Sequence, residues 1–525
     1  MPGGFRFVGP LLHGSIGVAR AGVPMRSIVP EKIHDPRDLP TGPLRDPAFD
    51  DTLAAPPGDA MSAHSGTVKA PALKGRILKA GSWTLGSTVV AMVLRLASNV
   101  VLAHLLFPDA FGLMSVVTML ITAMGLFSDI GISRSVIQSK NGADPDLLDT
   151  AWTLQVIRGF GLGAGCIGLA LLDMLAIRLE VFKPGTVYAD PRLAWLMIAF
   201  ALTPMIQGFD SIKIIQAKRQ MTLHATTKIE LTGQLASAIA MVIVAYVFRT
   251  VWTLVVGAFV AAAVRTWLGH MILPGHRTRL RLVRASVTEL LKTGRWVFLS
   301  SILFFLALNS DKFVLAALID KRLYGIYSIA LLMANVIQGL ATKMCMSIVY
   351  PALAEVHRER PRDLARTLSK FLWAYDGIIT VAGCALITGA PAVIHVLYDK
   401  RYADASWMLS LLAVGIVGLR YQVVEECYQA VGAPYLQTLA NLLRLCTLVF
   451  GVTAGLHFWG VGGAIAAVAL CQFSVWPLAL WFRWRRGIFI WRSEALVVPA
   501  IAAGLLLGWL VTLLAQWALP QRFAG

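Results

Sequence analysis

Residues 84–106 read TLGSTVVAMVLRLASNVVLAHLL, an apolar run with an arginine, Arg95, near its centre. A helix of about 20 apolar residues is long enough to cross the roughly 30 Å of hydrocarbon in a bilayer. An arginine near the bilayer centre costs about 2.5–3.5 kcal/mol even on the lenient insertion scale. The segment therefore predicts a transmembrane helix, and its internal charge suggests a function, most simply the binding of an anion.

Similar apolar runs follow one another to Leu519. The chain is 57% hydrophobic and only 14% charged, with a mean hydropathy of +0.67, which places it outside the soluble globular class. We predict an all-α polytopic membrane protein with thirteen spans, at residues 84–106, 111–133, 151–173, 193–209, 229–248, 251–273, 296–319, 323–350, 371–397, 405–430, 435–456, 458–482 and 495–519.

The first 80 residues differ from the rest because they are rich in proline and glycine and lack helical periodicity. We expect residues 1–80 to be disordered, and we expect translation to start at Met61, just before a basic stretch. The remaining chain divides into an N-terminal lobe (81–273), a basic cytoplasmic linker (274–295), a C-terminal lobe (296–482), and a basic loop with an additional span (483–525).

Lysine and arginine are concentrated in alternate loops, most strongly in PGHRTRLRLVRASVTELLKTGR between the sixth and seventh spans. The positive-inside rule places these loops, and the N-terminus, in the cytoplasm. The same rule accounts for the formal net charge of +18. We therefore expect no nucleic-acid partner.

Two segments of the chain resemble each other: VLAHLLFPDAFGLMSV (101–116) aligns without a gap with VLAALIDKRLYGIYSI (314–329). Gly112 aligns with Gly325, and Phe111 with Tyr324. The copies lie six predicted spans apart, and an even number preserves orientation. We therefore predict two six-helix lobes related as parallel repeats around a central cavity, an arrangement used by alternating-access transporters.

Charged residues within the predicted spans fall into two sets. The acids lie mostly near cytoplasmic helix ends, whereas the arginines lie nearer mid-span, so we predict a cationic cavity. The planar guanidinium group suits bidentate contact with phosphate or carboxylate, and a diphosphate fits this chemistry. We predict that Arg95, Arg420 and Arg444 bind substrate, with secondary candidates Arg265, Arg158, Lys312 and Lys343; the candidate gating or ion-pair acids are Asp129, Asp311, Asp376, Glu425 and Glu426.

Each of these charges has a structural alternative. Arg158, Lys312 and Lys343 lie close enough to a helix end to reach the interface or to pair with an acid on a neighbouring helix. Asp311 and Lys312 point about 100° apart on a helix, so they do not simply neutralise each other. The repeat also brings Asp129 near Lys343, which suggests a pair that opens and closes during transport.

The run VVLAHLLFPDAFGLMSVVTMLITAMGLFSDIGISRSVIQSK (100–140) resembles the N-terminal signature of the bacterial polysaccharide transporters, the Wzx-like flippases. DKFVLAALIDKRLYGIYSIALLMAN (311–335) and YPALAEVHRE (350–359) resemble the second-half signature of that family. The similarity extends from about Gly81 to the C-terminus. Members commonly have fourteen helices, so the thirteen spans found here are one fewer.

The resemblance implies the multidrug/oligosaccharidyl-lipid/polysaccharide exporter fold. It also implies movement of an undecaprenyl-diphosphate-linked glycan across the bacterial inner membrane, from the cytoplasmic to the periplasmic leaflet. The expected partners are the lipid-linked oligosaccharide, membrane lipid, and polymerase or export machinery. We expect no enzymatic activity and no cofactor. The sequence leaves open whether an ion gradient (H⁺ or Na⁺), substrate concentration or downstream consumption drives transport.

Two rival functions remain. A multidrug exporter of the same fold would be better served by carboxylates at mid-span, and a membrane glycosyltransferase would need a longer catalytic loop than this chain offers. The one D-x-D sequence, Asp144 to Asp146, contains Pro145 and precedes an apolar run, which favours a helix start over a metal site. The six cysteines lie in apolar runs and indicate no metal site. No G-x-x-x-x-G-K-[ST] phosphate loop is present.

Overall fold

A computed structural model gives the fold of this chain. It describes residues 70–523, with gaps at 128–131, 133–135, 137–143, 220–222, 277, 285–286, 288–304, 307–308 and 496. Within these residues the regular structure is helical, and the one β-bridge joins Thr186 to Asp320. The all-α prediction is therefore confirmed for the described part of the chain. The proposed start at Met61 lies outside it.

The N-terminal helices precede the linker. They are α1 (Ala70–Leu105), α2 (Pro108–Phe127), α4 (Pro145–Arg178), α5 (Arg192–Phe200), α6 (Leu202–Gly208), α7 (Lys213–Arg219), α8 (Leu223–Phe248) and α9 (Trp252–Ile272). Helix α1 already begins at Ala70, so the predicted disorder of residues 70–80 is wrong. The physical reason is that APALKGRILKA is rich in good helix formers and continues the apolar helix that follows it.

The C-terminal helices follow the linker. They are α11 (Lys321–Met344), α12 (Tyr350–Glu359), α13 (Leu364–Tyr375), α14 (Val381–Leu397), α15 (Ala405–Gly418), α16 (Gln422–Ala430), α17 (Pro434–Leu470), α18 (Trp476–Arg485), α19 (Trp491–Ala495), α20 (Val497–Ala518) and α21 (Pro520–Phe523). Short π or 3₁₀ turns join several of them, at Cys345–Val349, Pro361–Asp363, Asp376–Thr380, Lys400–Tyr402, Leu419–Tyr421 and Cys471–Val475. Residues 309–318 are also helical.

Ten helical segments in the described residues are long and apolar enough to cross a membrane, and Arg192–Gly208 is a shorter apolar one. One of the ten, Tyr435–Arg485, contains two predicted spans. Gly460 breaks α17 with φ 62° and ψ −152°, a conformation that favours glycine. The chain reverses there, so that Gly455 and Gly463 lie in close backbone contact. Of the 24 residues in the predicted span at 296–319, 11 lie outside the described residues (296–304 and 307–308).

The start of α4 settles the D-x-D alternative. Asp144 is the N-cap of α4, Pro145 follows it, and the Asp144 side chain accepts a hydrogen bond from the Asp146 backbone N–H. Asp146 pairs with Arg281. The interpretation of this sequence as a helix start is confirmed.

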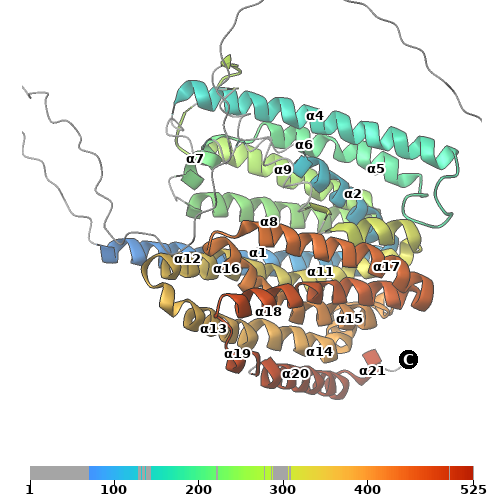
Figure 1. Cartoon of the computed structure of the whole chain (residues 1–525). Coiled ribbons are helices and arrows are strands. Elements are labelled where there is room, and N and C mark those ends of the chain that lie inside the picture. The colour runs from blue at the N-terminus through green and yellow to red at the C-terminus, as the bar shows by residue number, and fades with distance from the viewer. Residues whose placement is uncertain are drawn as a thin grey trace, which may run out of the picture. The chain divides into compact units, whose positions relative to one another are not determined.

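Helices α2 and α11 meet at the two glycines that the sequence repeat aligns. Gly112 and Gly325 are each the fifth residue of their helix. A Cβ on Gly112 would lie 3.2 Å from the Gly325 nitrogen, and a Cβ on Gly325 would lie 3.3 Å from the Gly112 nitrogen. A two-fold axis produces such contacts between equivalent residues. The packing of α2 against α11, both visible near the middle of Figure 1, therefore supports the predicted parallel repeat.

The N-terminal and C-terminal helices are also joined where α1 ends and α11 begins, which we call the closed side. Lys321 Nζ lies 3.0 Å from an Asp190 carboxylate oxygen, and the Lys321 backbone N–H donates to Gly185 O. His104 Nε2 lies 3.3 Å from Asp399, and the Tyr402 hydroxyl donates to Leu106 O. These contacts join the two sets of helices at this end of their interface.

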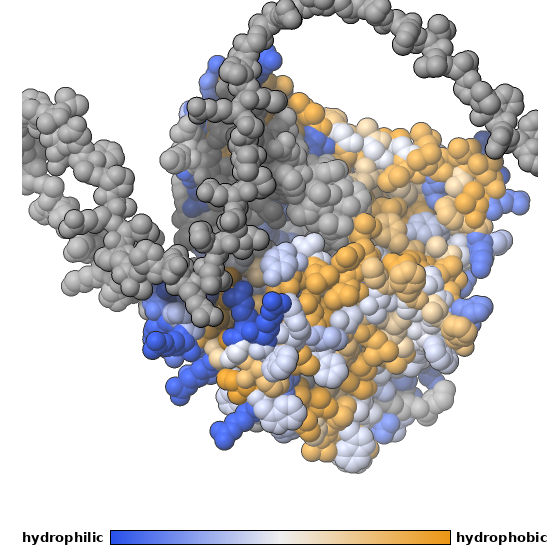
Figure 2. Space-filling view, in the orientation of Figure 1, coloured by the Kyte–Doolittle hydropathy of each residue, from blue (hydrophilic) through white to orange (hydrophobic). Residues whose placement is uncertain are grey.

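Large apolar side chains cover much of the outer surface. Figure 2 shows hydrophobic residues spread over the lengths of the helices and hydrophilic residues gathered near helix ends. Helix α20 contributes strongly, since only 12% of its apolar stretch is buried within the protein. Such a surface requires lipid as its solvent. The chain is a multi-pass membrane protein.

Candidate functional site

The N-terminal cavity holds about 550 Å³ and lies between α1, α2, α8 and α9 on one side and α11 with residues 309–312 on the other. Arg95 and Lys312 are the two charged residues that line it. No carboxylate is among its described lining residues, which otherwise combine apolar side chains with serine, threonine and amide groups. The cavity is therefore cationic, as the sequence predicts.

Arg95 lies on an exposed position of α1. Its side chain makes no ion pair with any residue that the structure describes. It also lines a smaller side cavity of about 240 Å³ between α1 and α8, together with Gln234 and Glu230. Arg95 and Gln234 border both cavities, so the side cavity extends the N-terminal cavity towards the beginning of α1, away from the closed side.

Lys312 stands between the N-terminal cavity and a second one. Its Nζ donates a 2.7 Å hydrogen bond to Asn309 Oδ1, and both residues line both cavities. The neighbouring Asp311 is buried, accepts a 2.8 Å hydrogen bond from the Tyr327 hydroxyl, and lines only the second cavity. The two charges therefore have different partners, as their helical positions predict.

The second, C-terminal cavity holds about 450 Å³ and is lined by residues 309–312, α11, α16 and α17 among others. Arg444 and Glu425 form an ion pair at its wall, and Gln437 Nε2 donates to the same carboxylate at 2.6 Å. Glu426 also lines the cavity. Three carboxylates (Asp311, Glu425, Glu426) thus face two cations (Lys312, Arg444), so the prediction of a cationic interior does not extend to this cavity.

Arg420 lies elsewhere. Its side chain is 2% exposed, and its Nε and Nη2 donate to the Asp376 carboxylate at 2.9–3.1 Å. Its Nη1 lies 2.6 Å from a Glu494 carboxylate oxygen, and its Nη2 also donates to the Ser493 carbonyl at 2.7 Å. It lines neither cavity. The prediction of Arg420 as a cavity residue, and of Asp376 as a gating acid, is therefore corrected to a structural ion pair.

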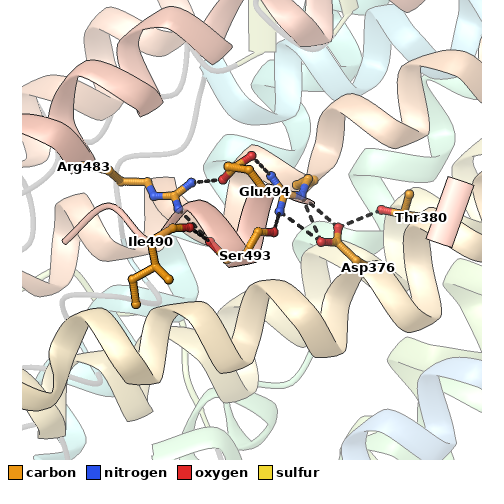
Figure 3. A network of polar contacts seen from close by, with 7 residues as sticks. Asp376, Thr380, Arg483, Ile490, Ser493 and Glu494 are labelled. Carbon is orange, nitrogen blue, oxygen red and sulfur yellow. Dashed lines mark hydrogen bonds and ion pairs between the residues drawn. The ribbon is translucent and has the colours of Figure 1, made fainter. Parts of the chain in front are cut away.

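A second buried arginine completes this network, which Figure 3 shows from close by. Arg483, 1% exposed, pairs with Glu494 and donates to the Ser493 hydroxyl at 3.0 Å. Thr380 donates to Asp376 at 3.1 Å. The sequence suggested that Arg483 belongs to a basic loop, but in the structure it lies in the last turn of α18. It fastens the segment before α20 to the C-terminal helices.

The remaining candidates line none of the cavities described above. Arg158 Nη2 donates a 2.5 Å hydrogen bond to Gly125 O, and Arg265 Nε lies 3.2 Å from Asp210. Both arginines thus bind groups within the N-terminal helices, which corrects their assignment to the cavity. Lys343 lies near the end of α11, outside the cavity linings. Asp129, and with it the proposed Asp129–Lys343 pair, lies outside the described residues.

The sequence reasoning missed the amides of the C-terminal cavity. Eight of its twenty lining residues are asparagine or glutamine. Part of the signal was present in α11, where Asn335, Gln338 and Thr342 recur at helical spacing inside an otherwise apolar span. A search restricted to charged residues could not find this stripe.

The chain was compared with known proteins. A sequence model described as "Polysaccharide biosynthesis protein" matches residues 101–407. The lipopolysaccharide biosynthesis protein WzxC of Escherichia coli (strain K12) is 28% identical over 353 residues, which are 66% of this chain and 68% of WzxC. The succinoglycan biosynthesis transport protein ExoT of Rhizobium meliloti (strain 1021) is 21% identical over 63% of this chain and 64% of ExoT.

Two solved structures share the fold. The lipid II flippase MurJ, in an inward closed conformation, superposes with a TM-score of 0.62 at 14% identity, over 83% of this chain and 99% of that one. An inward-facing multidrug resistance transporter of the MATE family and MOP superfamily superposes with a TM-score of 0.58 at 15% identity, over 77% and 95%. This chain therefore has the fold that these two proteins share.

Proposed function

Because the chain belongs to the polysaccharide biosynthesis protein family, we propose that it is a flippase that moves a polyprenyl-diphosphate-linked oligosaccharide across the bacterial inner membrane. The product would be a repeat unit for exopolysaccharide, capsule or O-antigen synthesis. The names of two relatives, a lipopolysaccharide biosynthesis protein and a succinoglycan transport protein, support this class of substrate.

The main observation in support of this proposal is the N-terminal cavity, which Arg95 and Lys312 line without any carboxylate among the other described lining residues. Two cations held in a low-dielectric cavity attract a multiply charged anion much more strongly than they would in water. A guanidinium group offers two parallel N–H donors to phosphate oxygens. A diphosphate is therefore the ligand that this cavity suits, whereas an organic cation would be repelled by Arg95 and Lys312.

The closed side supports an alternating-access cycle. On this side Lys321 pairs with Asp190, and Arg401 donates a hydrogen bond to the His104 carbonyl. The side cavity extends the N-terminal cavity towards the opposite end. With the N-terminus in the cytoplasm, the closed side is periplasmic and substrate enters from the cytoplasm. Separation of Lys321 from Asp190 then belongs to the step that opens the periplasmic side.

A deletion strain of the source bacterium tests the proposal. We expect a polyprenyl-diphosphate-linked oligosaccharide to accumulate in it and the surface glycan to disappear, and we expect the intact gene to reverse both. Arg95→Ala with Lys312→Ala should restore less than a tenth of the surface glycan, although an immunoblot shows a normal amount of protein in the membrane.

The matched control is Arg360→Ala, which removes an exposed arginine from the end of α12 that lines none of the cavities. It should restore the glycan fully. Normal export by the Arg95 and Lys312 double variant, or a deletion strain with no lipid-linked precursor, would contradict the proposed function.

A further inference from the structure

The two large cavities meet but differ in charge. Asn309, Lys312 and Asn335 line both of them, so the two cavities adjoin. The N-terminal cavity has two cations and no described carboxylate, whereas the C-terminal cavity has three carboxylates and two cations. A single ligand that fills both must therefore have one anionic part and one part that tolerates a slightly negative wall.

We propose that the C-terminal cavity is a subsite for the sugars nearest the diphosphate, and that it takes uncharged sugars and rejects carboxylated ones. This inference rests on the proposed function. It adds the chemical class of the glycan, which neither the family nor the relatives' names specify.

The amides carry the first part of the inference. Asn335, Gln338, Gln429 and Gln472 line the C-terminal cavity, and their side chains make no hydrogen bond with the described residues. Each amide offers two N–H donors and one acceptor oxygen. Sugar hydroxyl groups both donate and accept, so these amides can satisfy them without any net charge. A volume of about 450 Å³ lies within the roughly 300–1,000 Å³ typical of small-molecule sites.

The carboxylates carry the second part. Glu425 is held by Arg444, and Asp311 accepts from Tyr327, but Glu426 forms no ion pair within the described part of the chain. Glu426 is 7% exposed, and in its ionised form it accepts hydrogen bonds strongly from hydroxyl groups. In the same ionised form it repels a second carboxylate at that distance, and such repulsion is a common source of specificity. Glu426 is therefore the residue that should exclude a uronic acid.

Binding to the purified full-length protein in nanodiscs, at about pH 8.5 so that the carboxylates are ionised, tests the inference. The probes are polyprenyl diphosphate without sugar, the same lipid with a neutral disaccharide, and the same lipid with a disaccharide that contains a uronic acid. We expect the neutral glycolipid to bind at least about tenfold more tightly than the uronic acid glycolipid. Glu426→Gln should reduce this preference to less than about threefold, because it keeps the acceptor oxygen and removes the charge.

Two further variants separate sugar contacts from general damage. Gln338→Leu should weaken the neutral glycolipid about two- to tenfold, the range of one hydrogen bond, and leave the sugar-free lipid unaffected. Glu359→Gln, the same substitution as at Glu426 but on an exposed glutamate at the end of α12, should leave the preference unchanged.

The outcomes separate the two proposals. If all three lipids bind equally, and Glu426→Gln changes nothing, the sugar subsite is wrong while diphosphate binding stands. If the uronic acid glycolipid binds more tightly, the stated specificity is wrong. If the sugar-free lipid does not bind at all, the proposed function fails and the subsite fails with it.

Discussion

Arg420 and Arg95 both lie inside long apolar helical segments, yet their guanidinium groups meet opposite surroundings. Arg420 is 2% exposed and is held by Asp376, Glu494 and the Ser493 carbonyl. Arg95 is exposed on α1, borders two cavities and has no ion pair among the described residues. One charge is neutralised within the protein, and the other is open to a ligand.

The difference shows that the cost of placing an arginine inside a membrane can be met in two ways. A buried ion pair meets it with fixed carboxylates and hydrogen bonds. A polar cavity meets it with water or with an anionic substrate. Only the second arrangement has the properties of a binding site. The depth of a charge in the sequence cannot distinguish between them, but measurements of stability and of ligand binding can.

The largest effect on stability should come from Arg420→Leu. This change leaves Asp376 buried without its partner, and the loss of one partner from a buried pair typically costs about 3–5 kcal/mol. The purified protein should unfold at a much lower temperature or fail to accumulate. A thiol-reactive dye can report unfolding in detergent, because five of the six cysteines are buried.

The matched experiment is the double variant Arg420→Leu with Asp376→Leu. It removes both charges of the pair, and replacement of a whole buried pair by apolar residues is often nearly neutral. We expect it to recover most of the lost stability, although Glu494 then keeps only Arg483. Full stability of the single Arg420→Leu variant would refute the structural role.

The next effect should come from Gly325→Ala, at the contact between α2 and α11. The added Cβ would lie 2.0 Å from the Pro108 carbonyl oxygen, so the two helices must move apart. Overpacking of this kind costs about 1–3 kcal/mol. Gly161→Ala is the control, since a Cβ there meets nothing within 4 Å, and it should be neutral or stabilising. Equal melting temperatures for the two variants would contradict the close packing.

The helices and the repeat could be predicted from the sequence because both depend on local patterns. Apolar length alone identifies α1 as a membrane span, and the alignment of Gly112 with Gly325 anticipates two equivalent helix positions. The sequence also predicts a reversal near Gly460, between the spans 435–456 and 458–482, because the apolar run from Tyr435 is too long for one crossing. These features require no knowledge of which helices become neighbours.

The partners of the charges could not be predicted, because they depend on tertiary contacts. Arg420 meets Glu494, which lies 74 positions later in the chain, after what reads as a basic loop. Arg444 meets Glu425 across a turn between two helices. In each case the acid that neutralises the arginine lies on a different helix. Arg95 and Lys312 line the N-terminal cavity and pair with no described acid, so they remain candidates for substrate binding.

A smaller effect should come from Asp190→Asn on the closed side. Burial alone would raise the pKa of Asp190, but hydrogen bonds from Arg192 and Lys321 outweigh burial and hold the pKa below its usual range. Both cations are partly exposed, at 54% and 32%, so solvent screens the interaction. The variant should lose only about 0.2–1 kcal/mol at pH 7.

The sign of the pH dependence follows from the lowered pKa of Asp190. A carboxylate with a depressed pKa in the folded state stabilises the protein above its unfolded pKa of about 3.9, and this stabilisation is lost as the pH falls through the folded value. The difference in melting temperature between the natural protein and Asp190→Asn should therefore be constant between pH 5 and 7 and shrink only below about pH 4. A difference that disappears already at pH 6 would point to another group.

The smallest effect on stability should come from Arg95→Ala. No described carboxylate loses a partner and no packed contact is removed, so the free energy of unfolding should change by less than about 0.5 kcal/mol. Soluble diphosphate should raise the melting temperature of the natural protein and should do so less for this variant, because a ligand that binds the folded state stabilises it. A large loss of stability without diphosphate would mean that Arg95 resembles Arg420 and that the two surroundings do not differ as proposed. If Arg95→Ala is stable but responds to diphosphate as the natural protein does, Arg95 is exposed to the cavity without contributing to anion binding, and Lys312 becomes the principal cation.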